Sequence, residues 1–247
     1  MQADQSVIAP MQDAFTAGDL VMTVDIVNAV GQAVPAWGSF PLNRWLIVAS
    51  VVLFALSLGS FYHIFPHLFK CHTRWRWNFT LEASMQLARM RNFFAFMMIT
   101  PFCLIVSRYD ILQIDIIKQY VPREWMTGAI IGVLLLYMLV RLMTYGMISS
   151  RSRQSNTITV AHKTSINFFV VLTLLMVLTT GILFANGAEE GTFRTAILLE
   201  MVVLYVVMIL WEGEILLGSC NPLTTFLYLC ALEFVPTGLL IAANICL

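Results

Sequence analysis

The sequence predicts an all-α polytopic membrane protein, a bundle of six transmembrane helices, and two observations carry this prediction. Of the 247 residues, 59% are hydrophobic and only 11% are charged, and the mean hydropathy is +0.81. In an ordinary soluble domain, about a quarter of the residues are charged. In addition, six apolar runs are long enough to cross the roughly 30 Å hydrocarbon layer, which takes about 20 helical residues. They lie near 45–65, 91–109, 126–147, 166–185, 193–211 and 222–246.

The chain before the first run is predicted to be an extracytoplasmic tail, residues 1–44, followed by the transmembrane domain at 45–247. Its start lacks the basic and apolar regions of a cleavable signal peptide, so we expect the first membrane helix to direct insertion. The stretch LVMTVDIVNAVGQAVPAWGSFP, residues 20–41, has mixed apolar spacing. It fits either a helix lying on the outer membrane surface or a loosely ordered tail, and both interpretations stay open.

The first span ends in a turn rich in histidine, aromatic and basic residues, YHIFPHLFKCHTRW. Imidazoles four residues apart, as in His63 and His67, could share a metal ion. Pro66 interrupts that helical turn, however, and no acidic or second cysteine ligand follows. We therefore predict no metal here, and we expect the basic loop, which includes Trp75 and Trp77, to meet anionic lipid head groups or a partner.

The second and third spans each contain a residue that a membrane disfavours. Pro101 interrupts the second span, which is tolerated when neighbouring helices satisfy the freed carbonyl. In the third, Arg141 shares a stripe with Tyr137 and Thr144, and the rise of an α-helix places it ~8 Å from the cytoplasmic edge. Because a long side chain covers that depth by snorkelling, Arg141 is predicted to be an interfacial anchor rather than a buried counter-ion.

The distribution of lysine and arginine predicts on which side of the membrane each loop lies. Counting Arg141, nine of the 14 basic residues lie in or beside the segments 66–90 and 148–165, and five lie on the other side. Both segments are therefore expected in the cytoplasm, and both termini in the periplasm.

The sixth run contains a glutamate three residues before a proline. Glu233 follows Pro222 by 11 residues, so it lies ~16 Å along the helix, near the middle of the bilayer. A charged side chain there normally faces the bundle interior and a partner. Because Pro236 has no amide hydrogen, the carbonyl of Leu232 is left free and the helix is expected to bend. The helical spacing places four polar residues on one stripe, namely Cys230, Glu233, Thr237 and Asn244.

A second intramembrane acid, Glu200, lies in the fifth run at a similar estimated depth, because the two helices run in opposite directions. If Glu200 and Glu233 meet, both cannot be ionised, and one carboxyl should keep its proton at neutral pH. Two interpretations follow. The acids either pin helices together through interhelical hydrogen bonds, or they bind and release a proton or a ligand.

The sequence has no motif of an assembled active site. There is no glycine-rich phosphate loop, no HExxH, no GxSxG and no histidine pair within a span to hold haem. We therefore expect no enzymatic activity and no cofactor. The 14 basic and 14 acidic residues balance, so no global field attracts nucleic acid. The five cysteines form no paired framework, and no disulfides are expected.

Two phrases in the C-terminal third, RTAILLEMVVLYVV and CNPLTTFLYLCALEFVPTG, are fairly specific. On these phrases the chain resembles an inner-membrane family of Bacteroidota known as domain of unknown function 4271, and the hydropathy outline agrees over most of the chain. The resemblance implies a multi-pass protein of a Gram-negative inner membrane with a link to envelope assembly or secretion. It transfers no activity, although Glu200 and Glu233 both lie in the matching phrases.

We accordingly predict a bacterial inner-membrane protein that serves as a binding or assembly subunit of a cell-envelope system. Its expected partners are the lipid bilayer and a membrane protein of an envelope complex. The alternative is a small proton-coupled carrier that uses the intramembrane glutamates. The absence of inverted repeats, and of interrupted helices in matching halves, counts against a typical secondary transporter.

Overall fold

The chain divides into two units, Met1–Phe40 and Pro41–Leu247. Of the first unit only a short 3-10 helix, η1 (Trp37–Ser39), and the residue after it belong to the part of the chain that is described. The predicted tail helix at 20–41 lies largely outside that part. The computed structural model describes residues 37–111, 120–151, 155–238 and 242.

In the second unit, five long helices each contain a stretch that is long and apolar enough to cross a membrane. They overlap the first five predicted spans, and no β-strand occurs in the ranges just given. The prediction of an all-α polytopic membrane protein is therefore confirmed. The five helices are α3 (Pro41–Thr73), α5 (Met85–Arg108), α7 (Met126–Arg151), α8 (Ser155–Ala185) and α9 (Glu190–Leu217).

The sixth predicted span, 222–246, is described as far as residue 238 and at 242. It begins as α10 (Pro222–Leu229) and continues as a π-helical segment, η3 (Cys230–Phe234), before returning to α-helix. Its remaining residues, including Asn244, lie outside the described part of the chain. A single 3-10 turn, η2 (Arg123–Trp125), leads into α7.

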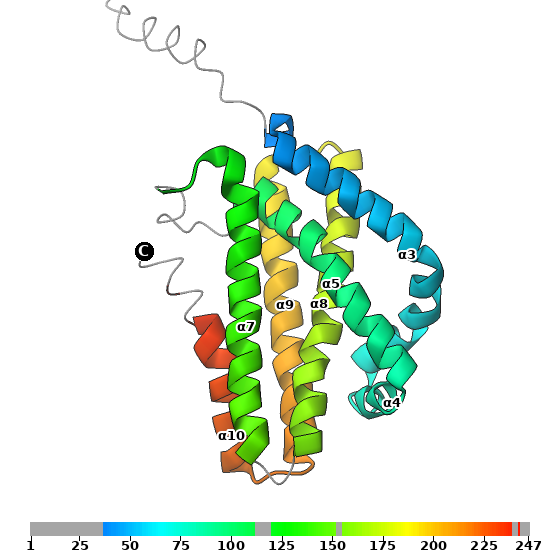
Figure 1. Ribbon diagram of the computed structural model, residues 1–247, viewed down its shortest axis with the longest axis vertical. Coiled ribbons are helices and arrows are strands. Elements are labelled where there is room, and N and C mark those ends of the chain that lie inside the picture. Colours follow the sequence, from blue (N-terminus) through cyan, green and yellow to red (C-terminus); the bar gives the residue numbers. More distant parts are fainter. Residues whose placement is uncertain (1–36, 112–119, 152–154, 239–241, 243–247) are drawn as a thin grey trace, which may run out of the picture. The chain divides into compact units, whose positions relative to one another are not determined.

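The long helices extend beyond the apolar runs that predicted them. α3 continues through Pro66 to Thr73, and α8 begins at Ser155, so much of the predicted loops 66–90 and 148–165 is helical. A helix need not end where the hydrocarbon ends, because its backbone hydrogen bonds are satisfied internally. Pro66 removes one of those bonds, and α3 curves in its second half (Figure 1). The expectation that Pro66 interrupts the helical turn is wrong.

A short helix that the apolar pattern does not indicate, α4 (Trp77–Ala83), lies between α3 and α5. The side-chain amide of Asn167 on α8 donates to Asn78 Oδ1 at 2.7 Å, and this bond is buried. Arg91 on α5, which is 1% exposed, forms an ion pair with Glu82 of α4. Together with the buried side chain of Leu81, these two contacts fix α4 against its neighbours.

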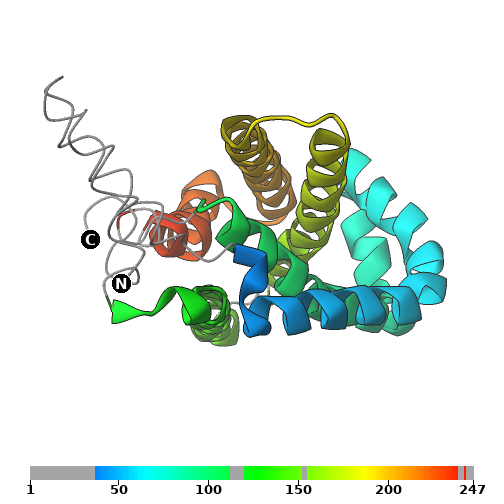
Figure 2. The ribbon, with the colours of Figure 1, turned by 90° about the horizontal axis from the view of Figure 1, so that it is seen from above.

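α8 is the central helix of the bundle. It contacts α3, α4, α5, α7 and α9, and its buried side chains take part in three apolar core clusters, through Val170, Met176 and Ile158. Seen from above, α10 lies at one edge of the bundle and the α3–α4 turn at the opposite edge (Figure 2). The polar groups of α10 and of α4 are therefore held on opposite sides of a common apolar core.

The outer surface of the bundle carries many large apolar side chains. Leu56 and Phe184, for example, are 80% and 79% exposed. In water such a surface would be costly, whereas lipid tails are as apolar as the side chains themselves. This surface therefore agrees with a bundle surrounded by hydrocarbon.

Candidate functional site

The candidate site is a cluster of three buried charged residues, one from each of α7, α9 and η3. Arg141, Glu212 and Glu233 are 6%, 3% and 1% exposed. One guanidinium nitrogen of Arg141 donates to Glu233 Oε1, and the same nitrogen lies 3.6 Å from Glu212 Oε1. Two acids from different helices thus converge on a single arginine, and we call these residues the Arg141 cluster.

The π-helical segment positions Glu233 in this cluster. Pro236 cannot donate to the carbonyl of Leu232, and the preceding turn is widened, with the amide of Val235 donating to the carbonyl of Cys230 five residues earlier. The phenol of Tyr205 on α9 donates to the backbone carbonyl of Glu233 at 3.4 Å. The predicted irregularity before Pro236 is therefore present, as a π-turn with a side-chain donor from α9.

A second polar contact lies one turn away from the cluster and joins the same two helices. Tyr137 and Arg141 are four residues apart on α7, as Glu233 and Thr237 are on the last helix, so each pair shares a helix face. The hydroxyl groups of Tyr137 and Thr237 lie 3.3 Å apart. Of the stripe predicted from the sequence, Glu233 and Thr237 thus face α7, and Cys230 is a free, half-buried thiol.

The structure does not bring Glu200 to Glu233. Glu200 accepts a hydrogen bond from Thr179 on α8, and it precedes Glu212 on α9 by 12 residues, or ~18 Å of helix. The predicted depths of the two acids assume helices about as long as the hydrocarbon layer is thick, roughly 30 Å. They are wrong because α9 has 28 residues, or ~42 Å of helix. The hypothesis that Glu200 and Glu233 share a proton is wrong.

Arg141 is a buried counter-ion, and the prediction of an interfacial anchor is wrong. α7 continues to Arg151, ten residues past Arg141 rather than the six assumed from hydropathy. The guanidinium thus lies ~15 Å from the end of its helix. Because two carboxylates inside the bundle balance the charge of the guanidinium, the side chain does not need to extend to the membrane surface.

Glu212 is the member of the cluster that the sequence interpretation omitted. The fifth predicted span, 193–211, ends just before Glu212. Two signals could have identified it: the run resumes with Ile215, Leu216 and Leu217, and Glu212 follows Tyr205 by seven residues, which places both on one helix face.

The cluster holds more acid than base. Two carboxylates against one guanidinium leave one negative charge uncompensated, and an uncompensated charge is expensive in a low-dielectric interior. Binding of one proton by either carboxyl makes the cluster neutral. Among the described residues, Glu233 Oε2 has no hydrogen-bond partner, and Glu212 Oε1 has no hydrogen bond but lies 3.6 Å from the Arg141 guanidinium. Glu233 Oε2 is therefore the oxygen best placed to receive that proton.

No protein-family model, curated protein or solved structure matches this chain. The resemblance to the Bacteroidota family therefore stays a prediction. What the site can do has to be argued from the chemistry of its own residues.

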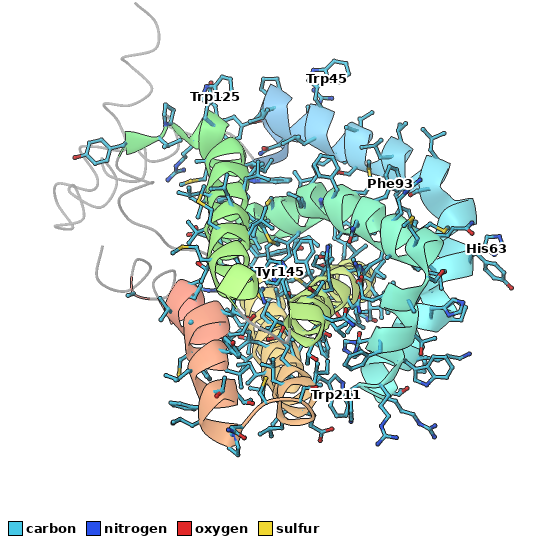
Figure 3. The ribbon with its side chains drawn as sticks, turned by 60° about the horizontal axis from the view of Figure 1, so that its bottom comes forward. Trp45, His63, Phe93, Trp125, Tyr145 and Trp211 are labelled. Atoms are coloured by element: carbon cyan, nitrogen blue, oxygen red, sulfur yellow. The ribbon has the colours of Figure 1, made fainter. Side chains whose placement is uncertain are left out.

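Hydroxyl and imidazole groups lie on α7 and α8 beyond Arg141, toward the end of α7. Tyr145 lies one helical turn beyond Arg141, and its phenol oxygen is 2.6 Å from Thr159 Oγ1. The Tyr145 ring, which lies between α7 and α8 (Figure 3), stacks on His162 with centroids 4.5 Å apart. These groups offer polar neighbours on the side of the cluster that faces the basic end of the bundle.

The histidines of the α3 turn are not gathered into a site. His63 points away from the bundle (Figure 3), whereas His72 is half-buried and its ring lies 4.0 Å from that of Phe168. Among the described residues, no group of three histidine, cysteine, aspartate or glutamate side chains could hold a metal ion.

Proposed function

We propose that this chain is a non-enzymatic membrane carrier in which binding and release of one proton at the Arg141 cluster drives the transport step. The observation that carries the proposal is that two buried carboxylates share one arginine. Intramembrane acids of this kind are the common elements of proton relays in carriers and pumps.

The π-turn supports a role in coupling. Such turns often occur at functional sites. Here the turn contains Glu233 itself and lies on α10 and its continuation, at the edge of the bundle (Figure 2). A change in the charge of the cluster would alter the attraction between Glu233 and Arg141, and so the position of this peripheral helix against α7 and α9.

We further propose that the protein lies in a bacterial inner membrane with both termini in the periplasm. The positive-inside rule supports this orientation. The helix α4, the end of α7 and the start of α8 lie toward the same end of the bundle (Figure 1). A role as an assembly subunit with a membrane-protein partner stays a prediction.

The carrier function is tested by replacing each acid of the cluster with its amide. Glu212→Gln and Glu233→Gln leave one acid for one arginine, so both variants should fold at normal membrane levels. Neither glutamine can release a proton, so both should fail to complement a deletion strain. In infrared difference spectra of the purified protein, the carboxyl band that changes between pH 5 and pH 9 should be reduced in both variants.

Two matched controls belong to this experiment. Glu214→Gln changes an exposed acid on the same helix, and Glu200→Gln changes an intramembrane acid outside the cluster. Both should retain full complementation. Full complementation by Glu212→Gln and Glu233→Gln would show that the cluster only holds the helices together.

A further inference from the structure

The turn around α4 carries a second polar feature, which is independent of the Arg141 cluster. Four basic side chains are exposed there, where α3 ends and α5 begins: Lys70, Arg74, Arg76 and Arg89. The same turn contains one acid, Glu82, whose charge is balanced by the buried Arg91. In the described part of the chain, none of the four exposed cations forms an ion pair with a carboxylate. The turn therefore presents uncompensated positive charge.

Two of these cations are held by aromatic rings. The Lys70 ammonium lies 5.1 Å from the ring centre of Trp77, and the Arg76 guanidinium lies 5.3 Å from that of Trp75. Both tryptophans are half-buried, and a cation over an indole face is attracted by the ring. The charges are thus placed on a fixed surface.

The short helix α4, which directly follows Arg74 and Arg76, is anchored on two sides. Asn78 is bonded to Asn167 of α8 and, through its own side-chain amide, to the carbonyl of Trp75 at 3.1 Å. Glu82 is bonded to Arg91 of α5. A ligand that binds here need not order the turn first, which lowers the cost of binding.

The turn connects the membrane span of α3, Pro41–Gly59, with that of α5, Met85–Arg108. It therefore lies on one side of the membrane and leads directly into the second span at Met85. Exposed apolar side chains adjoin the cations, with Phe69 at 63% and Met85 at 77% exposed. Basic residues next to a span together with tryptophan at the interface match an anionic lipid, whose phosphate takes the charge and whose acyl chains take the apolar side chains. An acidic protein segment would match the charge alone.

We propose that the α3–α4–α5 turn binds the phosphate-bearing head group of an anionic phospholipid, with Lys70, Arg74 and Arg76 as its principal contacts. The membrane would supply this ligand, and the site does not depend on the carrier function. Because α4 packs on α3, α5 and α8, bound lipid would stabilise the half of the bundle that lies away from α10.

The test titrates the purified full-length protein in a non-ionic detergent with phosphatidylglycerol or phosphatidylcholine and counts bound lipid by native mass spectrometry. The test variant is Lys70→Gln/Arg74→Gln/Arg76→Gln. Removal of three charges next to a membrane surface should raise the Kd for phosphatidylglycerol about 100-fold. Binding of phosphatidylcholine should be weak for both proteins and should not change.

Two further variants make the outcome decisive. Arg44→Gln/Arg123→Gln removes exposed charges from the other ends of the helices and should leave the Kd within about two-fold. Lys70→Arg/Arg74→Lys/Arg76→Lys keeps the charge and should retain most of the binding. The proposal is overturned by equal phosphatidylglycerol binding in the triple Gln variant, by equally tight binding of phosphatidylcholine, or by complete displacement with millimolar inorganic phosphate, which would indicate a site for the free anion.

Discussion

In the part of the chain that the structure describes, two arginines are buried, and their partners balance them differently. Arg91 meets one carboxylate, Glu82, and also donates to Asn92 Oδ1 at 2.9 Å and 3.2 Å. Arg141 meets two carboxylates. The first arrangement is a balanced pair suited to fixing α4, whereas the second holds surplus acid and can change its protonation. The difference between the two lies in the number of acids, since both arginines are almost completely buried.

The charge balance at Arg141 gives a stability prediction. Arg141→Leu leaves two buried acids without a counter-ion, and breaking a buried pair in this way costs about 3–5 kcal/mol of unfolding free energy. Arg141→Leu/Glu212→Gln/Glu233→Gln removes the uncompensated charge and should recover most of that loss. Unfolding in mixed detergent micelles measures both values. If the triple variant is as unstable as the single one, the arginine acts through packing rather than charge.

His72 gives a prediction on pH dependence. Burial lowers the pKa of His72 below its ordinary value of 6.5, so the unfolded chain binds this proton more readily than the folded protein does. The contribution of neutral His72 is therefore present above about pH 6.5 and is lost as the pH falls below it. The Tm of His72→Phe should fall less between pH 8 and pH 5 than that of the parent. His63→Phe, at an exposed position, should keep the parental pH dependence, and a similar effect of both substitutions would contradict the assignment to His72.

At the scale of the element, we expect Pro236 to determine the conformation of the last described helix, α10 with its continuation η3. α10 is attached to the bundle through α9, while η3 contacts α7, and the π-turn decides which way Glu233 faces. A π-turn inserts one extra residue into a helix, and one residue corresponds to about 100° of rotation in an α-helix. In a regular α-helix, the residues before Pro236 would therefore be rotated by about 100° relative to those after it. We therefore expect the proline to act on the cluster through the backbone.

Pro236→Ala tests this link. Alanine restores an amide for the carbonyl of Leu232, so the π-turn should relax to α-helix and Glu233 should leave Arg141. The variant should be destabilised, and its effect should not add to that of Arg141→Leu, because both changes break the same ion pair. Unfolding free energies for the double-mutant cycle should give a coupling of about 0.5–3 kcal/mol. Simple additivity would mean that the proline does not position Glu233.

At the scale of the whole molecule, the long helices alternate in direction, so that α4, the end of α7 and the start of α8 lie toward one end of the bundle (Figure 1). We expect this end to face the cytoplasm. In a background without native cysteines, Ser155→Cys should resist a membrane-impermeant thiol reagent in intact cells and react after lysis, and Gln5→Cys should react in intact cells. Labelling of Ser155→Cys from outside would invert the topology and, with it, the orientation of the Arg141 cluster.

Much of this fold could be predicted from the sequence, because hydrocarbon accepts only segments whose backbone hydrogen bonds are satisfied internally. An apolar run of about 20 residues therefore has to be a helix. The ends of the helices could not be predicted in the same way. α3 and α8 continue past their apolar runs, because the membrane does not decide where a helix stops once it has left the lipid.

The sequence by itself determined the membrane class and identified Glu233 as the acid most in need of a partner, since a carboxylate in an apolar run before a proline is costly wherever it faces. Only the tertiary structure decided what that partner is. Glu200, Glu212 and Arg141 are all within plausible reach of Glu233 when helices are treated as rods of equal length. The lengths of α7 and α9, and the π-turn before Pro236, place Arg141 and Glu212 beside Glu233 and leave Glu200 with Thr179. Height and rotation of packed helices depend on contacts between distant segments, and no local pattern of residues specifies them.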